Sequence, residues 1–207
     1  MQNVRNIIFD LGGVILDIDF KRTEKAFIDL GITNFGELFG LGHAASFFKD
    51  HEAGRITDDE FLDSLRKLAN YSLAGEAVQK AWNALLISFP AERIELLKRL
   101  SGRYRLFLLS NTNAIHLSAF QKIYRENFNN GSFNDLFEKV YYSHEIRLRK
   151  PDKEIYQFVL KDSHLDAPET VFIDDALVNV EAAKELGMQA IHIKPGQSIL
   201  DINWDLD

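Results

Sequence analysis

The chain has 207 residues, of which 46% are hydrophobic and 27% charged, so it can bury a substantial core without disulfides or structural metals. Its formal charge of -7 at pH 7 argues against a nucleic-acid partner, because the chain lacks the basic surface that a phosphate backbone requires. The absence of cysteine excludes disulfides, thiolate metal sites and a thiol nucleophile, and it is compatible with the reducing cytoplasm. No apolar run approaches the roughly 18 residues of a membrane span, and no signal peptide precedes the first predicted strand. We therefore expect a cytoplasmic protein without a membrane or nucleic-acid partner.

Short apolar segments recur along the chain, and each ends at polar or turn-forming residues. They are Val4–Phe9, Leu106–Leu109, Val171–Ile173 and Gln189–Ile193, with a weaker fifth at Lys139–Tyr142. Helical patterns lie between them, one beginning at Lys150-Pro151 and another ending at Gly187. Strands that alternate with helices predict an α/β fold with a doubly wound parallel sheet, whose ligands bind at the carboxyl ends of the strands.

The stretch from Asp17 to Phe89 interrupts this alternation, since it contains several amphipathic helical patterns and no convincing strand. Within it, Thr57 and Glu60 have the spacing of a capping box. We expect a small all-helical domain, inserted after the first strand, at residues 17–87. Residues 1–16 and 88–207 would then form the α/β core.

Polar side chains follow the predicted strands at their carboxyl ends. Asp10 follows the first strand, Ser110 the second, and the pair Asp174-Asp175 the third, while Lys150 precedes a helix. Taken singly, Asp10 before two glycines is typical of a turn, and Ser110 is typical of a helix N-cap. Together, the carboxylates at one edge of a sheet would repel one another unless a cation lay among them.

Magnesium is the cation that such a set of hard oxygen ligands favours, and it commonly shares phosphate oxygens. The pattern therefore predicts metal-dependent phosphoryl transfer. Asp10 would attack phosphorus to give an aspartyl phosphate, which water would hydrolyse, and Ser110 and Lys150 would hold the phosphoryl oxygens.

Four sequence segments resemble the motifs of the haloacid dehalogenase-like hydrolases, and the resemblance covers essentially the whole chain. The segments are FDLGGV, LLSNTN, KPDKEIY and FIDDALVNVEAA. Two of them, in the longer forms DLGGVILDIDF and LSNTNAIH, are similar to bacterial phosphatases acting on α-glucose 1-phosphate. The resemblance implies a Rossmann-like core with a four-helix cap. It also implies a small phosphorylated metabolite, such as a sugar phosphate, as the substrate.

The same resemblance implies roles for single residues. Asp10 corresponds to the nucleophile, Ser110 to a phosphate ligand and Lys150 to the lysine of the third motif. Asp175 corresponds to a direct Mg²⁺ ligand, Asp174 to a direct or water-mediated one, and Gly12 to the residue whose backbone carbonyl binds the metal.

The chain departs from the family pattern at Gly12, where the phosphatases usually carry an aspartate that acts as general acid and base. The loss of that carboxyl is expected to slow catalysis by about 10²- to 10⁴-fold or to restrict it to good leaving groups. A sugar 1-phosphate, whose anomeric oxygen leaves more readily than an ordinary alkoxide, suits such a site. Substitute donors are Asp17, Asp19 and His116, although caps, turns and surface positions explain these residues as well.

Further residues are candidates for contact with phosphate or substrate. Asn111, Thr112 and Asn113 extend the loop after Ser110, although helix capping explains Thr112 and Asn113 nearly as well. His116 follows on the next helix, and Arg55 lies in a turn of the insertion that can reach the mouth of the cleft.

The alternative to a phosphatase is a weakened module that binds a phosphorylated ligand without useful turnover. Gly12 is its support, and the retention of the other polar positions opposes it. A dehalogenase would not need the acidic pair, and a phosphomutase would want the missing acid. In a phospho-receiver domain the acidic pair comes before the phosphoacceptor, which is not the order here.

Overall fold

A five-stranded parallel sheet forms the centre of the molecule. The computed structural model describes residues 3–39, 46–69, 73–128 and 131–205. The strand order is β5-β4-β1-β6-β7, with every neighbouring pair parallel. The strands are β1 (Asn6–Phe9), β4 (Arg105–Ser110), β5 (Lys139–Tyr142), β6 (Thr170–Asp174) and β7 (Gln189–His192). All five strands predicted from the sequence are present, and the predicted doubly wound parallel α/β fold is confirmed.

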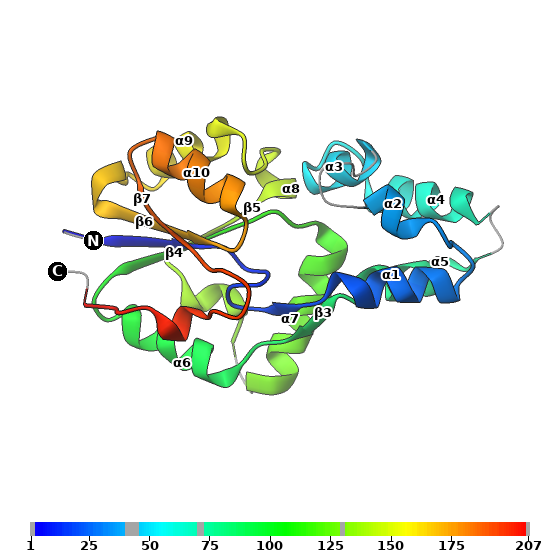
Figure 1. Cartoon of the computed structure of the whole chain (residues 1–207), viewed down its shortest axis with the longest axis horizontal. Helices are drawn as coiled ribbons and strands as arrows, with labels where there is room; N and C mark the ends of the chain where they lie inside the picture. Colours follow the sequence, from blue (N-terminus) through cyan, green and yellow to red (C-terminus); the bar gives the residue numbers. More distant parts are fainter. Residues whose placement is uncertain (1–2, 40–45, 70–72, 129–130, 206–207) are drawn as a thin grey trace.

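Helices cover both faces of this sheet (Figure 1). One face is covered by α6 (Ala91–Leu100) and α7 (Ala114–Phe128), and the other by α9 (Lys153–Asp162) and α10 (Leu177–Glu185). Four shorter helical segments complete the core: α8 (Ser143–Ile146) and the 3₁₀ turns η1 (Phe133–Leu136), η2 (Ala167–Glu169) and η3 (Ile199–Asp201).

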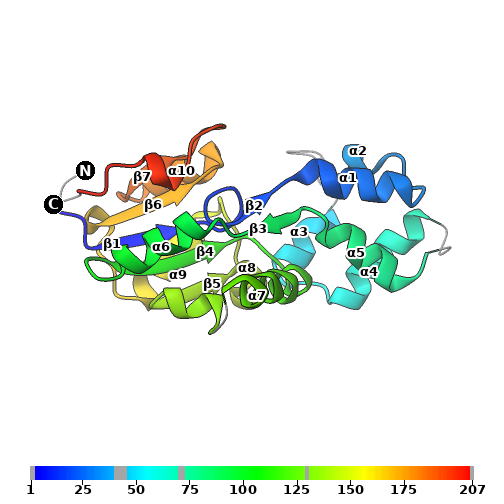
Figure 2. The same ribbon diagram turned by 90° about the horizontal axis from the view of Figure 1, so that it is seen from below.

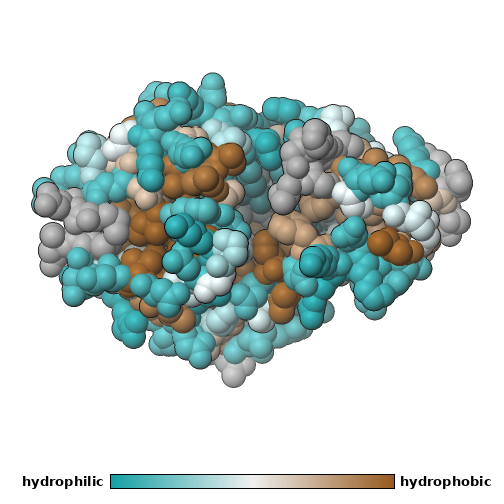
Figure 3. Space-filling model, in the orientation of Figure 1, coloured by the Kyte–Doolittle hydropathy of each residue, from teal (hydrophilic) through white to brown (hydrophobic). Residues whose placement is uncertain are grey.

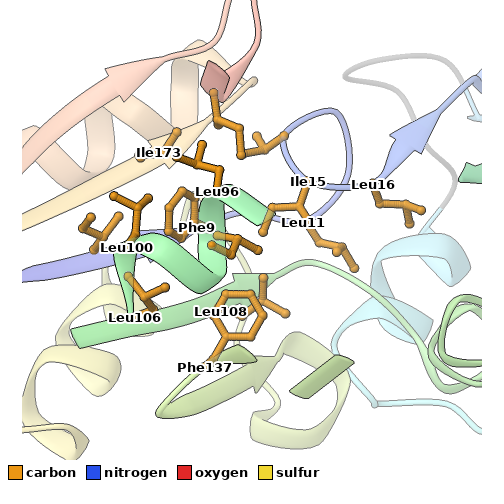
Figure 4. Packing of buried hydrophobic residues seen from close by; sticks show 14 of the residues in the cluster. Phe9, Leu11, Ile15, Leu16, Leu96, Leu100, Leu106, Leu108, Phe137 and Ile173 are labelled. Carbon is orange, nitrogen blue, oxygen red and sulfur yellow. The ribbon is translucent and has the colours of Figure 1, made fainter. Parts of the chain in front are cut away.

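Alternating side chains of the central strand explain why the sheet needs helices on both sides. Ile7 and Phe9 pack in the cluster that includes residues of α6 and α7, whereas Ile8 packs in the cluster that includes residues of α9 and α10. Figure 4 shows Phe9 beside Leu108 and Ile173 of the two neighbouring strands. Because β1 is buried on both faces, its position and therefore that of Asp10 are held firmly.

A second group of helices lies to one side of the sheet, away from the chain ends (Figures 1 and 2). It comprises α1 (Phe20–Asp29), α2 (Phe35–Phe39), α3 (Ser46–Glu52), α4 (Asp58–Leu68) and α5 (Gly75–Asn83). These helices bury a cluster of their own that is rich in aromatic rings, including Phe27, Phe35, Phe48, Phe61 and Trp82. The predicted helical insertion is therefore present, with five helices in its described part rather than the four that the family resemblance implies.

The structure corrects two local predictions. The insertion was expected to lack strands, yet its ends form an antiparallel ribbon of β2 (Asp17–Ile18) and β3 (Leu86–Ser88). Strands of two and three residues are too short to leave a recognisable alternation in sequence. The helix expected to begin at Lys150-Pro151 begins at Lys153, after the N-cap residue Asp152. By contrast, the capping box of Thr57 and Glu60 is confirmed. The predicted end of a helix at Gly187 is also confirmed, since Gly187 lies just beyond α10 with φ +84°.

The surface in the orientation of Figure 3 is mainly hydrophilic, with hydrophobic side chains gathered towards its middle. In the described ranges, no helix combines the length and the apolar character needed to cross a membrane.

Candidate active site

Three of the predicted site residues meet at the carboxyl edge of the sheet. Asp10 follows β1, Ser110 is the last residue of β4, and Asp174 is the last residue of β6. Since β1 lies between β4 and β6 in parallel register, the three residues come to the same edge of the sheet. Asp10 and Asp174 are 164 residues apart in the sequence. This edge is where ligands of open α/β sheets bind.

Lys150 joins this group from the loop between α8 and α9, ahead of a helix as the sequence predicted. Its Nζ donates to Asp10 Oδ1 at 2.6 Å and to Asp174 Oδ2 at 2.7 Å, and the side chain is buried. Burial opposes the charge of Lys150, but the two carboxylates outweigh it and raise the pKa of its ammonium. Lys150 is therefore a fixed cation between two of the predicted catalytic carboxylates.

Asn111 positions this lysine. Its Oδ1 accepts a hydrogen bond from the backbone N–H of Lys150, and its Nδ2 donates to the carbonyl of the same residue, both at 2.9 Å. The sequence predicted that Asn111 binds phosphate or substrate. Because both ends of its amide are occupied, the structure instead makes its side chain a support for the Lys150 loop.

Asp174 is held by more groups than any sequence motif indicated. Besides Lys150, the backbone N–H of Ala176 donates to Oδ1 at 2.8 Å, and the side-chain amide of Asn179 donates to both oxygens at 3.0 and 3.1 Å. Asn179 is buried, and the sequence analysis missed it. The available signal was an asparagine on the first turn of the helix that follows the acidic pair.

The three aspartates form a set suited to a divalent cation. One oxygen from each of Asp10, Asp174 and Asp175 lies within 4.8 Å of the others. Asp175 is exposed, and within the described chain its carboxylate accepts no side-chain hydrogen bond. Three carboxylates face a single buried ammonium, which leaves excess negative charge that a hard cation would neutralise. The residues present therefore fit Mg²⁺.

Crowding of the carboxylates changes their acidity. Burial raises the pKa of Asp10 to about 7, with Asp174 adding to the rise and Lys150 opposing it. Burial, reinforced by Asp174, also raises the pKa of Asp175. Both carboxyls thus resist losing their protons until a cation compensates the charge.

Gly13 brings the backbone close to this acidic set. It adopts φ +74°, and a Cβ built on it would overlap Oδ2 of Asp175. The neighbouring Gly12 does not have a positive φ, and a Cβ there would meet only Cδ1 of Ile18 at 3.0 Å. Steric demand for glycine therefore lies at position 13, and position 12 has room for a side chain after a small shift of Ile18.

We expect Gly13→Ala to lose at least about tenfold in apparent Mg²⁺ affinity, because the new methyl group must displace Asp175 and force an L-residue into left-handed backbone. Isothermal titration with Mg²⁺ measures the effect, and Gly12→Ala is the matched control. Equal affinities in the two variants would show that the Gly13 contact does not position the metal ligand.

Ser110 and Thr112 lie at the carboxyl end of β4. Ser110 is buried, and no described protein group is hydrogen-bonded to its hydroxyl, so the hydroxyl is free for a ligand. The Thr112 N–H donates to Ser143 Oγ at 2.9 Å, and the same oxygen lies 3.0 Å from the Thr112 carbonyl. The Thr112 side chain itself remains a predicted ligand contact.

Asn113 and His116 have structural partners that the prediction of substrate contact did not foresee. Oδ1 of Asn113 accepts from the backbone N–H of His116 at 2.9 Å, which is helix capping. Both ring nitrogens of His116 are engaged, one with the Asn113 amide at 3.1 Å and the other with the carbonyl of Trp82 at 3.1 Å. Burial lowers the pKa of His116 to about 4, so the ring is neutral near pH 7 and has no free nitrogen. We therefore assign neither residue to substrate.

Arg55 does not reach the cluster. Its side chain is 60% exposed and pairs with Asp50 at 3.1 Å, within the helical insertion. The turn that carries it does reach the core, through Glu52: the carbonyl of this residue accepts from Ser143 Oγ at 2.6 Å. Arg55 is therefore turned away from the cluster, and the nearby residue that lines the hollows is Glu52.

Two hollows that share lining residues lie between the sheet edge and the helical insertion. The inner cavity, of about 100 Å³, is lined by residues that include Gly12, Ser110, Thr112, Glu52 and Trp82. The outer cleft, of about 580 Å³, is lined by residues that include Phe39, Glu52, Arg149, Lys150 and Asn179. Glu52, Asn111, Phe20 and Phe39 line both. A larger groove of about 950 Å³ between α1, α5 and α7 is lined by neither Ser110 nor Lys150, whereas Ser110 lines the inner cavity and Lys150 the outer cleft. The two smaller hollows are therefore the ones that adjoin the clustered polar residues.

Comparison with known proteins agrees with this geometry. The sequence matches the family model of haloacid dehalogenase-like hydrolases over residues 4–187. A D-ribitol-5-phosphate phosphatase of Bacteroides thetaiotaomicron is 34% identical, over 93% of this chain and 93% of its own. A glyceraldehyde 3-phosphate phosphatase of Methanocaldococcus jannaschii is 25% identical, over 94% of this chain and 86% of its own. A crystal structure of a HAD family enzyme of Bacteroides thetaiotaomicron, in complex with magnesium and inorganic phosphate, superposes with a TM-score of 0.85 at 34% identity and 98% coverage of each chain.

The family model covers most of the chain, including the strands that carry Asp10, Ser110 and Asp174. The similarity to the ribitol phosphatase runs over nearly the whole of both chains. The motifs quoted from the sequence, the parallel sheet and the residues gathered at its edge thus agree, and this chain belongs to the haloacid dehalogenase-like hydrolase family.

Proposed function

We propose that this protein is a magnesium-dependent phosphatase that hydrolyses a small phosphorylated metabolite through an aspartyl phosphate on Asp10. The observation that carries the proposal is the acidic set of Asp10, Asp174 and Asp175, with the buried Lys150 held against two of its members. Phosphoric monoester hydrolysis is the activity named for both relatives described above.

Asp10 is the group placed to attack phosphorus. It directly follows a strand that is buried on both faces, and its Oδ1 accepts a hydrogen bond from Lys150 Nζ at 2.6 Å. In the first step an Asp10 oxygen bonds to phosphorus as the bond to the leaving alcohol breaks. In the second, water attacks the same phosphorus and releases the Asp10 carboxylate. The ammonium of Lys150 and the free hydroxyl of Ser110 stabilise the charge on the phosphoryl oxygens.

Asp10, Asp175 and the backbone carbonyl of Gly12 would hold Mg²⁺. Both oxygens of Asp174 already accept hydrogen bonds from Lys150 and Asn179, so we place Asp174 in contact with the metal through water. When bound, the cation offsets the negative charge that Asp10 and the phosphate bring together.

The helical insertion, residues 17–87, is proposed as the cap over this site, with residues 1–16 and 88–207 as the catalytic core. The outer cleft of about 580 Å³ lies between them and has the size of a small-molecule pocket. We propose a sugar or polyol phosphate as the substrate. Glucose 1-phosphate is the candidate from the sequence motifs, and ribitol 5-phosphate from the named relative.

A panel of phosphorylated metabolites tests the function. Glucose 1-phosphate, glucose 6-phosphate, ribitol 5-phosphate, glyceraldehyde 3-phosphate and nucleotides are assayed for phosphate release with Mg²⁺ and with EDTA. We expect turnover of at least one sugar or polyol phosphate, loss of turnover in EDTA, and recovery on adding Mg²⁺. Phosphate release that is unchanged by EDTA would contradict the metal-dependent mechanism.

Gly12 supports a second candidate function, a module that binds a phosphorylated ligand without turnover. Family phosphatases usually have an aspartate at this position, and glycine has no carboxyl. In that case a phosphorylated metabolite of the panel would raise the melting temperature of the protein in the presence of Mg²⁺, yet no phosphate would be released.

The raised pKa of Asp10 leads to a pH dependence of metal binding. Protons compete with the cation for this carboxylate below about pH 7, so the apparent Mg²⁺ affinity should rise from pH 5.5 to about pH 7 and then level off. Calorimetric titration at pH 5.5, 6.5 and 8 measures the trend, and the proton released on binding is detected by repeating it in two buffers. A constant affinity across this range would exclude Asp10 as a ligand that must lose a proton.

A further inference from the structure

The inner cavity raises the question of which group handles the proton of the leaving alcohol, since Gly12 has no carboxyl. Among the described residues lining this cavity, only Glu52 and His116 are ionisable. Both nitrogens of His116 are already engaged, as shown above. Asp17, another candidate from the sequence, is paired with Arg93 at 2.8 Å, and Asp19 caps α1 by accepting from the Lys21 N–H. Neither aspartate lines either hollow.

Glu52 is held in the site by the packing of α3 against α8. Its carbonyl accepts a hydrogen bond from Ser143 Oγ at 2.6 Å. Two residues on, Gly54 has φ +61°, and a Cβ there would overlap the carbonyl oxygen of His144. These contacts fix the end of α3 on the same segment that Thr112 of the β4 loop binds through Ser143. Glu52 is thereby a residue of the insertion that is anchored to the catalytic core.

The carboxylate of Glu52 is half-buried and has one free oxygen. Arg149 donates to Oε2 at 3.1 Å, and no described protein group bonds Oε1. Burial raises the pKa of this carboxyl, and the charges of Arg149, Lys150 and Lys49 only partly oppose the rise. Glu52 lines both hollows and keeps one carboxylate oxygen without a protein partner among the described residues, so it can act as an acid or a base.

We propose that Glu52 is the general acid and base of the reaction, in place of the carboxyl that the family pattern has at position 12. This inference rests on the proposed phosphatase function. The observation that supports this proposal is that Glu52, Gly12 and Ser110 line the same small cavity. Glu52 thus brings a carboxyl from the insertion to the cavity in which position 12 has none.

Glu52 gives a proton in the first step and takes one in the second. As Asp10 bonds to phosphorus, the electron pair of the breaking P–O bond goes to the alcohol oxygen, which takes the proton of the Glu52 carboxyl. The Glu52 carboxylate then takes a proton from water as the water oxygen attacks phosphorus and the bond to Asp10 breaks. Phosphate leaves, and Asp10 is again a carboxylate and Glu52 again a carboxyl.

The test compares an alkyl phosphate with p-nitrophenyl phosphate in Glu52→Gln. The alkyl substrate is the most active of the panel's primary-alcohol phosphates, glucose 6-phosphate, ribitol 5-phosphate and glyceraldehyde 3-phosphate, whose oxygen leaves badly without a proton. We expect its kcat/KM to fall by about 10²- to 10⁴-fold. Nitrophenolate leaves without protonation, so the variant should release about one equivalent of it per site in a fast phase and then turn over slowly, because the second step still lacks its base.

Asp50→Asn is the matched control, since it removes one carboxylate from the same helix. Asp50 pairs with Arg55 and lines neither hollow, so both substrates should be hydrolysed at wild-type rates. In a second variant, Gly12→Asp is added to Glu52→Gln, because position 12 can accept a side chain. The new carboxyl should recover part of the activity on the alkyl phosphate.

The outcomes that reject the role of Glu52 differ from those that reject the phosphatase function. Equal losses on both substrates without a fast phase, no loss at all, or a double variant with the leaving-group dependence of Glu52→Gln alone would overturn the role of Glu52. If the wild type hydrolyses neither substrate, or if Asp10→Asn hydrolyses both at wild-type rates, the proposed function itself fails.

Discussion

Replacing Asp10 by asparagine is expected to reduce turnover by at least about 10⁴-fold, because the amide keeps the shape of the side chain but is a far weaker nucleophile towards phosphorus. The fold should survive. Asp174 remains as a partner for Lys150 at 2.7 Å, and the substitution relieves the repulsion between two neighbouring carboxylates.

The measurement is phosphate release by Asp10→Asn and wild-type protein purified side by side, with the melting temperature of each as the check on folding. The substitution does not change Asn111, so the Lys150 loop should stay in place through its two 2.9 Å hydrogen bonds with Asn111. Residual activity within tenfold of wild type, in enzyme free of contaminating phosphatase, would rule out Asp10 as the nucleophile.

Asp175→Ala is expected to weaken Mg²⁺ binding more than Asp174→Ala does, by at least about tenfold, because the two carboxylates have different partners. Asp175 is exposed and free for a metal, whereas Asp174 is fully buried and bonded to Lys150, Asn179 and the Ala176 N–H. Loss of a direct ligand costs more metal affinity than loss of a residue that orients its neighbours.

The reverse order should hold for stability. Asp174→Ala leaves Lys150 with Asp10 as its buried partner but leaves the Asn179 amide and the Ala176 N–H without an acceptor, which costs about 1–3 kcal/mol in the free energy of unfolding. Asp175→Ala removes an exposed, crowded charge and should leave the melting temperature nearly unchanged. Metal titration and thermal unfolding of both variants separate the two roles, and a much weaker Mg²⁺ affinity in Asp174→Ala than in Asp175→Ala would reverse the assignment.

The strands and the place of Asp10 at the edge of the sheet could be predicted from sequence because their signals are local. Val4–Phe9 is apolar and stops at Asp10, and the later strands repeat that pattern, so the parallel sheet and its reactive edge follow from chain topology. The departure at Gly12 was also visible, since it needs only a comparison with a family motif. The steric requirement for glycine at position 13 could not be seen in the sequence, because it arises from Asp175, which lies 162 residues further along the chain.

The sequence by itself determined the α/β core, the inserted helices and the acidic set with its lysine, since hydrophobic periodicity and the order of motifs are properties of short segments. Only the tertiary structure decided how the side chains around that set are used. Asn111 supports Lys150, Asn179 holds Asp174, and His116 is closed off by its partners. It also decided that Glu52, rather than Arg55, faces the site, because the direction in which a turn presents its side chains depends on packing against α8, a segment about 90 residues further along the chain.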